Sequence, residues 1–298
     1  MRPQRGLRGR LVVAALGRLP RPLLDQVPSD VPETHLVRAA RRRVVVVTGL
    51  GGAGLLARSL TARPGSRRFV VLTLTTAVTW TAGALGSGPL HLGRIEGRDS
   101  RLRRPVITPV ATGVGAFGVF YLGALVARRI PVLDRAISQV LAFADQGTTK
   151  AVVATTCANG VGEELFFRGA LYAAAGDHNP VVVSSLAYAS VTAATGNPAL
   201  TLAGAAMGVL FGLQRRASGG VQAPVLTHLS WSILMLCRLP SLFRDHTTDR
   251  HRSPQRPFPR MTTEANSRRR KLGVLGNRGV GHQPAHCGRG CATEPTAD

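Results

Sequence analysis

Aromatic residues, acidic residues and lysine are all scarce in this sequence. Aromatic side chains make up 5% of the 298 residues, and 15 Asp and Glu are outnumbered by 38 Lys and Arg, which gives a formal net charge of +23. Lysine occurs only at Lys150 and Lys271, so nearly all of the positive charge is arginine. A chain this basic could bind nucleic acid. However, no stretch interleaves basic and aromatic side chains as a base-stacking surface does, so we expect no nucleic-acid partner.

Cysteine is scarce too. The four cysteines give no disulfide framework: Cys157 and Cys237 lie in or beside apolar segments, and Cys287 and Cys291 belong to the sequence "HCGRGC". One cysteine pair beside His286, without a second pair of ligands, is a weak indication of a metal site. We therefore predict free thiols, and neither a bound metal nor another cofactor.

Charge is absent from long stretches of the chain. Residues 69–90 and 106–127 contain no charged side chain, and a helix needs about 20 mainly apolar residues to cross a bilayer. The remaining apolar runs are 44–57, 151–175, 181–194, 199–213 and 221–236. A soluble protein of this size would need more amphipathic helices with charged faces. The sequence therefore predicts an all-α fold, a multi-pass transmembrane helical bundle with six or seven spans, lying in the lipid bilayer of the cell membrane.

The segments outside these runs define the domain organisation. Residues 1–43 and 244–298 are rich in arginine and proline, cannot bury enough apolar surface to offset the entropy of ordering, and are expected to be disordered. Residues 128–150 place apolar side chains at helical spacing, as an amphipathic helix in the membrane interface does. We therefore divide the rest of the chain into N-terminal membrane helices at 44–127, this interfacial segment and a membrane core at 151–238.

One glycine pattern has a second interpretation. The sequence "RRRVVVVTGLGGAG" contains G-x-G-x-x-G at Gly49, Gly51 and Gly54, as a dinucleotide-binding turn does. Such a site would also need an acidic residue about 20 positions later, and residues 69–90 contain none. Glycines are common in membrane helices, where they let backbones approach closely, and we favour that interpretation.

One apolar region carries an isolated group of charges. The sequence "NGVGEELFFRGALYAA" holds Glu163, Glu164 and Arg168, and Asp177 is the one other charged residue in the range 151–213. On a helix, Glu164 and Arg168 form a favourable i, i+4 pair, whereas Glu163 points about 100° away and has no evident local partner. Each charge costs about 2.5–3.5 kcal/mol at the centre of a bilayer. Glu163 is therefore a candidate general base, and an ion pair that only joins two helices is the alternative.

A histidine follows in the next charge-poor region. In "GGVQAPVLTHLSWSILML", His228 and Ser232 are four residues apart and share one helix face. A lone histidine in such a run is more often a packing residue than a catalytic one. Together with two glutamates and an arginine, however, it indicates a polar cavity. A carboxylate and an imidazole can activate a water and stabilise a developing oxyanion.

The two motifs resemble those of the CPBP family of intramembrane endopeptidases, also called the CAAX protease and bacteriocin-processing (Abi) family. "EELFFRG" is similar to the family's E-E-x-x-x-R-G motif and "APVLTH" to its A-P-x-x-x-H motif. The resemblance covers about residues 151–236. It implies that Glu163 activates the attacking water, that Glu164 pairs with Arg168 and fixes the helix, and that His228 helps to hold the water or the oxyanion.

Two motifs depart from the family pattern. The family usually has F-x-x-x-H in the next helix, where this chain has Tyr188 and Thr192, and its last motif ends in Asn, where this chain has Ser232. The resemblance makes these three residues possible supporting groups. Hydroxyls can hydrogen-bond, but they cannot act as an imidazole base near neutral pH. A catalytic zinc needs about three protein ligands, and His228 is the one histidine left in the matching positions.

Two functions follow from the resemblance. The first is a peptide hydrolase that cleaves membrane-associated peptide or protein substrates with a glutamate-activated water. The second is a non-catalytic member of the same family that binds a peptide or a membrane partner in the polar cavity. The altered positions Thr192 and Ser232 favour the second function, whereas the cost of keeping Glu163, Glu164 and Arg168 in a membrane favours the first. The sequence indicates no oligomeric state.

Overall fold

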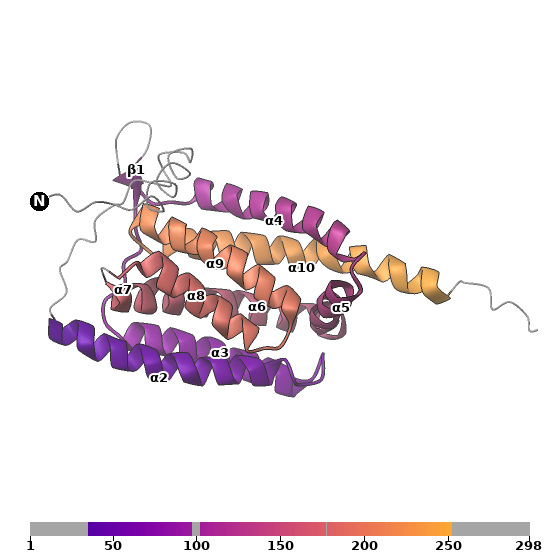
Figure 1. Ribbon diagram of the computed structural model, residues 1–298, viewed down its shortest axis with the longest axis horizontal. Coiled ribbons are helices and arrows are strands. Elements are labelled where there is room, and N and C mark those ends of the chain that lie inside the picture. The colour runs from indigo at the N-terminus through magenta and orange to yellow at the C-terminus, as the bar shows by residue number, and fades with distance from the viewer. Residues whose placement is uncertain (1–34, 97–101, 177, 252–298) are drawn as a thin grey trace, which may run out of the picture. The chain divides into compact units, whose positions relative to one another are not determined.

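The computed structural model describes residues 35–96, 102–176 and 178–251 (Figure 1). In chain order the elements are α2 (His35–Ser59), α3 (Arg67–Gly86), β1 (Ile95–Glu96), β2 (Leu102–Arg103), α4 (Ile107–Ala127), α5 (Pro131–Gln146), α6 (Thr149–Glu164), the π-helix η2 (Leu165–Leu171), α7 (Tyr172–Ala175), α8 (Pro180–Ala193), α9 (Pro198–Ser218) and α10 (Gln222–His251). Within the described residues, β1 and β2 are the only strands and form one short antiparallel pair. The predicted all-α class is therefore confirmed.

The helices run back and forth alongside one another (Figure 1), and α6 contacts helices from both the N-terminal and the C-terminal part of the chain. It packs against α3 and against α10, and its continuation η2 contacts α3 as well. Around it, α2 packs on α3, α8 on α9 and α4 on α10. The amphipathic α5 runs crosswise, near the point where α4 ends and α9 begins, and contacts α6, α9 and α10 (Figure 1). Residues on α6 are therefore within reach of several helices from distant parts of the chain.

Polar residues at the helix ends fix where the helices begin and end. Ser66 precedes α3, and its hydroxyl accepts a hydrogen bond from the backbone N–H of Phe69. Asn197 precedes α9 and accepts from the N–H of Leu200 in the same way, while its Nδ2 donates to the carbonyl of Ala136 in α5. These side chains satisfy backbone donors that a helix N-terminus leaves unpaired. Asn197 thereby caps one helix and attaches another to it.

Glycines allow the helices around α6 to approach closely. A Cβ built at Gly162 in α6 would lie 2.8 Å from the carbonyl oxygen of Ala77 in α3. A Cβ at Gly113 in α4 would lie 2.8 Å from the carbonyl oxygen of Thr227 in α10. In both places a backbone oxygen is in the way, and at Gly113 the Cβ of Ser230 is also 2.7 Å away, so a larger residue cannot be accommodated by a side-chain rotation. Small residues at helix–helix contacts are typical of membrane bundles.

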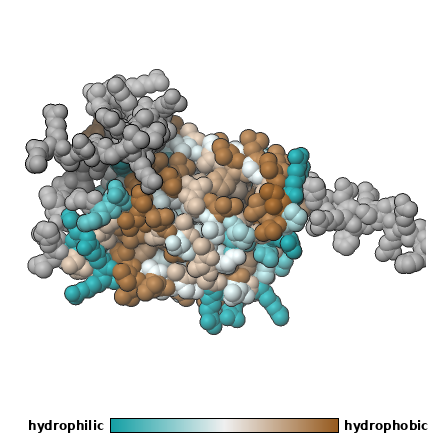
Figure 2. All heavy atoms as spheres, viewed as in Figure 1, coloured by the Kyte–Doolittle hydropathy of each residue, from teal (hydrophilic) through white to brown (hydrophobic). Residues whose placement is uncertain are grey.

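The outer faces of the helices are apolar. Large hydrophobic side chains point away from the bundle along α2, α3 and α4, and Leu50 and Val119 are 74% and 69% exposed. Figure 2 shows that most hydrophilic side chains on the visible face lie toward the ends of the helices, with hydrophobic and small residues between them. Exposed apolar area of this extent is typical of a membrane protein. Among the described helices, three are long and apolar enough to cross a bilayer: Arg67–Gly86, Ile107–Ala127 and Gln222–Phe243. The predicted number of six or seven spans therefore stays a prediction.

The N-terminal boundary needs a correction. We expected disorder up to residue 43, but α2 already begins at His35. The fully buried guanidinium of Arg41 donates to Ser87 Oγ at 3.2 Å and to the carbonyl of Pro89 at 3.1 Å, and Arg42 donates to the carbonyl of Ala174 at 3.0 Å. Tertiary contacts of the arginines therefore extend the helix beyond the apolar run. The glycines of the G-x-G-x-x-G pattern lie inside this helix.

The tail boundary also moves. Helix α10 continues to His251, although we expected disorder from residue 244. Leu239 and Phe243 near this end are buried against Ala124 and Leu141, so the packed core reaches almost to residue 244. The interfacial position of α5 stays a prediction. Residues 1–34 and 252–298, with Cys287 and Cys291, lie outside the described residues.

Two substitutions in α4 test the close contact with α10. Gly113→Ala should lower the free energy of unfolding by about 1–3 kcal/mol, because the new methyl group meets the backbone of Thr227. Gly115→Ala is the matched control, since a Cβ there has no neighbour within 4 Å and alanine favours a helix. Thermal unfolding of both variants in detergent measures the difference. Equal stability of the two variants would contradict the described α4–α10 contact.

Candidate active site

A cavity of about 690 Å³ opens beside the charged segment of α6. Its walls come mostly from apolar side chains of α4, α5, α9 and α10. The polar side chains of its lining include Asn159, Glu163, Tyr188, Thr192, His228 and Ser232. A largely apolar pocket with a few polar groups is the usual form of a ligand or substrate site. This cavity therefore contains most of the site residues predicted from the sequence.

The charged segment changes helix type at the site. The α-helix α6 ends at Glu164, and the π-helix η2 follows without a break. Wider π turns are rare and often occur at functional sites. Here the change buries the consecutive residues Phe166, Phe167 and Arg168. Trp80 of α3 packs on both phenylalanine rings, with ring centroids 4.5 Å and 5.2 Å away, which holds the segment in place.

Glu164 is the centre of a fully buried ionic network. Its Oε1 accepts a hydrogen bond from Arg168 Nη1 at 3.2 Å, and His228 Nδ1 lies 2.9 Å from the same oxygen. A carboxylate only accepts, so Nδ1 carries the hydrogen and donates it. Arg168 Nη2 donates to the carbonyl of Gly208 at 3.1 Å. The pair predicted from the i, i+4 spacing is present, and the network also joins α6 to α9 and α10.

A second buried arginine supports the π-helix. Arg215 Nε donates to the backbone carbonyl of Arg168 at 2.7 Å, and its guanidinium carbon lies 4.8 Å from the centroid of the Tyr172 ring. The sequence analysis did not single out Arg215. Its position at the end of an apolar helix gave no sign that it would turn inward. The contact fixes the backbone at the arginine that pairs with Glu164.

Glu163 turns away from this network and lines the cavity. Its Oε1 accepts a hydrogen bond from Asn159 Nδ2, and its Oε2 accepts one from the Tyr188 hydroxyl at 2.7 Å. Our expectation that Glu163 has no local partner was therefore wrong. Asn159 precedes it by one helical turn, and that spacing could have identified the contact. The carboxylate is held at both oxygens and is 6% exposed, on the cavity side.

His228 lies between the network and the cavity. Its ring stacks on Phe211 with centroids 4.9 Å apart, and Glu164 fixes the hydrogen on Nδ1. The imidazole therefore presents its other nitrogen, Nε2, which has no hydrogen-bond partner among the described residues. A hydrogen bond made by one ring nitrogen, as Nδ1 makes here, sets the tautomer of a histidine.

Thr192 and Ser232, which replace the family's histidine and asparagine, differ in their contacts. The Thr192 hydroxyl donates to the carbonyls of Tyr188 and Ala189 at 3.1 Å and 2.9 Å, so it bonds to its own helix rather than to Glu163. Thr192 also fills the space in front of Gly204, where a Cβ would lie 2.3 Å from its Oγ1. Ser232 is half-buried and lines the cavity one turn after His228.

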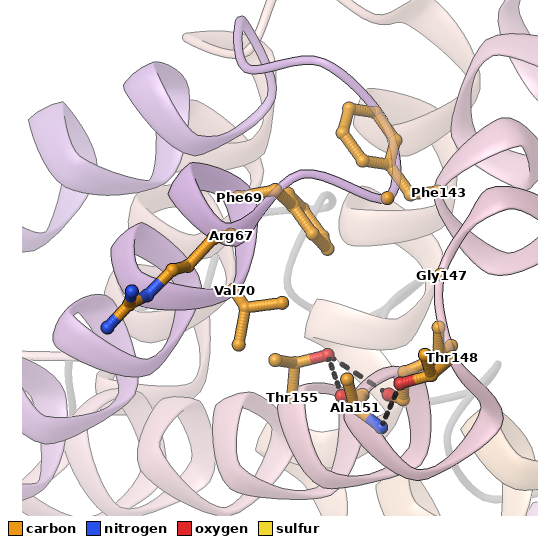
Figure 3. A pocket seen from close by; sticks show the side chains of 10 residues that line it. Arg67, Phe69, Val70, Phe143, Gly147, Thr148, Ala151 and Thr155 are labelled. Atoms are coloured by element: carbon orange, nitrogen blue, oxygen red, sulfur yellow. Dashed lines mark hydrogen bonds between the residues drawn. The ribbon is translucent and has the colours of Figure 1, made fainter.

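A smaller pocket lies beside the large cavity. It has a volume of about 260 Å³ and shares Phe69, Phe143, Val152 and Thr155 with the large cavity. Arg67 is its one ionisable lining residue, and Figure 3 shows the guanidinium directed away from the two phenylalanines. This pocket therefore offers no acid or base. Nowhere in the described part of the chain do three or more His, Cys, Asp or Glu side chains gather as metal ligands would.

Carboxylates and an imidazole beside an apolar cavity are groups able to activate a water and position it. In the comparison with protein families, residues 145–234 match the family described as "Type II CAAX prenyl endopeptidase Rce1-like". The match includes Glu163, Glu164, Arg168 and His228, and it confirms the resemblance of this region to the CPBP, or CAAX protease, family. No curated protein and no solved structure matches the chain.

The network predicts different stabilities for two conservative variants. Glu164→Gln removes the charge that faces both Arg168 and His228 and should destabilise the protein by about 3–5 kcal/mol, as breaking a buried ion pair does. Glu163→Gln is the matched control. Its partners Asn159 and Tyr188 are neutral, so this variant should lose less stability. Unfolding in detergent compares the two. A Glu164→Gln variant as stable as the control would show that the network does not support the fold.

Proposed function

We propose that the protein is an intramembrane endopeptidase that hydrolyses peptide bonds of membrane-associated substrates, with Glu163 as the base that activates the attacking water. The observation that carries the proposal is the position of the Glu163 carboxylate, which faces the cavity and is held by Asn159 and Tyr188. Two hydrogen bonds donated to its two oxygens can be accepted together by the ionised carboxylate. That form is the one able to take a proton from water.

Hydrolysis in this site proceeds through a tetrahedral intermediate. Water attacks the carbonyl carbon of the peptide bond while Glu163 takes one of its protons, and the carbonyl oxygen becomes an oxyanion. When the intermediate collapses, the carbon–nitrogen bond breaks and the proton passes from Glu163 to the leaving nitrogen. His228 presents Nε2, which accepts a hydrogen bond from the attacking water and so holds it near the reacting carbon.

The second glutamate has a positioning role in this mechanism. Glu164 touches Arg168 and His228 rather than the cavity, so it orients the imidazole and fixes its tautomer. Arg168 in turn donates to Gly208 on α9. The network therefore keeps the helices that carry Glu163 and His228 at a constant separation. Catalytic groups held in this way need no rearrangement during the reaction.

The substrate class follows from the apolar cavity and from the family. Apolar walls suit the hydrophobic part of a membrane-associated peptide better than a free polar peptide. The matched family is named for prenyl endopeptidases that act on CAAX sequences, and a lipid-modified peptide is therefore the first substrate to test. In this proposal the protein is a multi-pass protein of the cell membrane, in which α2, α3, α4, α8, α9, α10 and the continuous segment from α6 to α7 cross the bilayer.

A specific observation favours the alternative function. The Thr192 hydroxyl bonds to its own helix and gives Glu163 no help, at the position where the family usually has an imidazole. A protein that binds a peptide in the same cavity without cleaving it is therefore the second candidate. It shares the fold, the cavity and the Glu164 network with the first candidate and differs only in chemistry at Glu163.

The role of Glu163 is tested by peptide cleavage in vesicles. Glu163→Gln should abolish hydrolysis of an internally quenched peptide with a prenylated cysteine, because the amide has nearly the same shape but cannot take the proton. Asp134→Asn on α5 makes the same chemical change outside the cavity lining and should leave the rate unchanged. Full activity of the purified Glu163→Gln protein would refute the mechanism. Binding of the peptide without cleavage by the unmodified protein would support the second candidate.

A further inference from the structure

Tyr188 makes a contact that the family pattern does not require. It stands where the family usually has phenylalanine, and its hydroxyl donates to Glu163 Oε2 at 2.7 Å. The side chain is 7% exposed and lines the cavity next to that carboxylate. A phenylalanine would fill the same space without the hydrogen bond. The hydroxyl therefore adds a hydrogen-bond donor to the site, whereas the ring only fills space.

The Tyr188 ring is held so that its hydroxyl stays directed at Glu163. The guanidinium carbon of Arg168 lies 4.5 Å from the ring centroid, and the Phe167 ring meets it edge to face at 5.0 Å. Arg168 is itself fixed by Glu164 and by the carbonyl of Gly208. Because the ring is fixed, a change of hydrogen-bond partner needs only a rotation of the hydroxyl about its C–O bond, and a donor held in this way is preorganised to stabilise charge.

Two other donors near Glu163 are committed elsewhere, and a third holds its second oxygen. Thr192 donates to backbone carbonyls of its own helix, and Arg168 donates to Glu164 and Gly208. The Asn159 amide donates to Glu163 Oε1. Among the described residues, Tyr188 shares the other oxygen of the carboxylate with no second donor, and its hydroxyl can turn about the C–O bond toward a neighbouring acceptor. Once Glu163 has taken a proton from water, it is a weaker acceptor, and the phenol can donate to another oxygen.

We infer that Tyr188 is a catalytic residue of the site: its hydroxyl holds the Glu163 carboxylate before attack and then donates its hydrogen bond to the oxyanion, in place of the imidazole missing at Thr192. This inference rests on the proposed peptidase function. The phenol keeps its proton throughout, so the proton balance stays as described: one proton moves from water to Glu163 and then to the leaving nitrogen. Asn159 holds the other oxygen of Glu163 and is a positioning residue.

The first arm of the test removes the Tyr188 hydroxyl. The full-length protein in vesicles is given the internally quenched prenylated peptide, and kcat and KM are measured separately. Tyr188→Phe should lower kcat by about 10²–10³-fold, the usual effect of losing one oxyanion donor, with little change in KM. Tyr121→Phe on α4 is the matched control, because Tyr121 packs on Phe117 outside the cavity lining. Tyr188→Phe combined with Thr192→His should recover part of the lost kcat.

The second arm keeps the ring and the hydroxyl but makes the phenol more acidic. Fluorotyrosine introduced at position 188 should move the alkaline limb of the kcat–pH profile to lower pH, because the donor must keep its proton to act. A hydroxyl that only supports packing would leave this profile unchanged. If Tyr188→Phe folds poorly, this arm still tests whether the Tyr188 hydroxyl takes part in catalysis.

Glu163→Gln in the same assay separates the two conclusions. If that variant is inert and Tyr188→Phe keeps the unmodified rate, the peptidase function stands and the inference for Tyr188 is overturned. If the unmodified protein cleaves the peptide no faster than Glu163→Gln, the proposed function is overturned and the role of Tyr188 falls with it. A selective loss of kcat together with the shifted alkaline limb supports both.

Discussion

The ion pair between Glu164 and Arg168 is the interaction on which the site depends. Both side chains are fully buried among apolar helices, where an isolated charge is costly. Each charge is acceptable because the other is present and because further polar groups bond to it: His228 to the glutamate and the carbonyl of Gly208 to the arginine. Glu164 Oε2 and Arg168 Nε have no hydrogen-bond partner among the described residues. The partners come from α9 and α10, so the energetic need to satisfy two charges also determines how these helices meet α6. The arrangement of Glu163 and the cavity follows from that helix geometry.

The sequence predicted the parts of this structure that depend on local patterns. Long apolar runs identified most of the helices, and the i, i+4 spacing identified the pair of Glu164 and Arg168. Contacts between distant segments were beyond these patterns. Tyr188 reaches Glu163 only because α8 packs beside η2, and nothing within the sequence of α8 indicates that its phenol points inward. The start of α2 was missed for the same reason, since Arg41 is ordered by Ser87 and Pro89.

The π-helix marks a different limit of sequence interpretation. Predictions from helical spacing assume that the chain turns by the same angle at every residue of the segment. This assumption fails after Glu164, where the π-helix begins. The predicted ion pair survives because Glu164 is the last α-helical residue and the pairing spans only one turn. Beyond that point, the inward direction of Phe166, Phe167 and Arg168 together could not be derived from α-helical periodicity. The signal that remains is compositional: two aromatic residues beside an arginine in a charge-poor helix.

The backbone carbonyls that bind the buried arginines have a consequence for how the sequence can change. Arg168 donates to the carbonyl of Gly208 in addition to Glu164, and Arg215 donates to the carbonyl of Arg168, so both bind a main-chain oxygen. Every residue carries such an oxygen, so substitution of the acceptor residue leaves the acceptor in place as long as the helix keeps its course. A chain with 38 basic and 15 acidic residues can therefore bury arginines without a carboxylate for each of them. The few carboxylates are then available for roles that a carbonyl cannot fill, such as taking a proton.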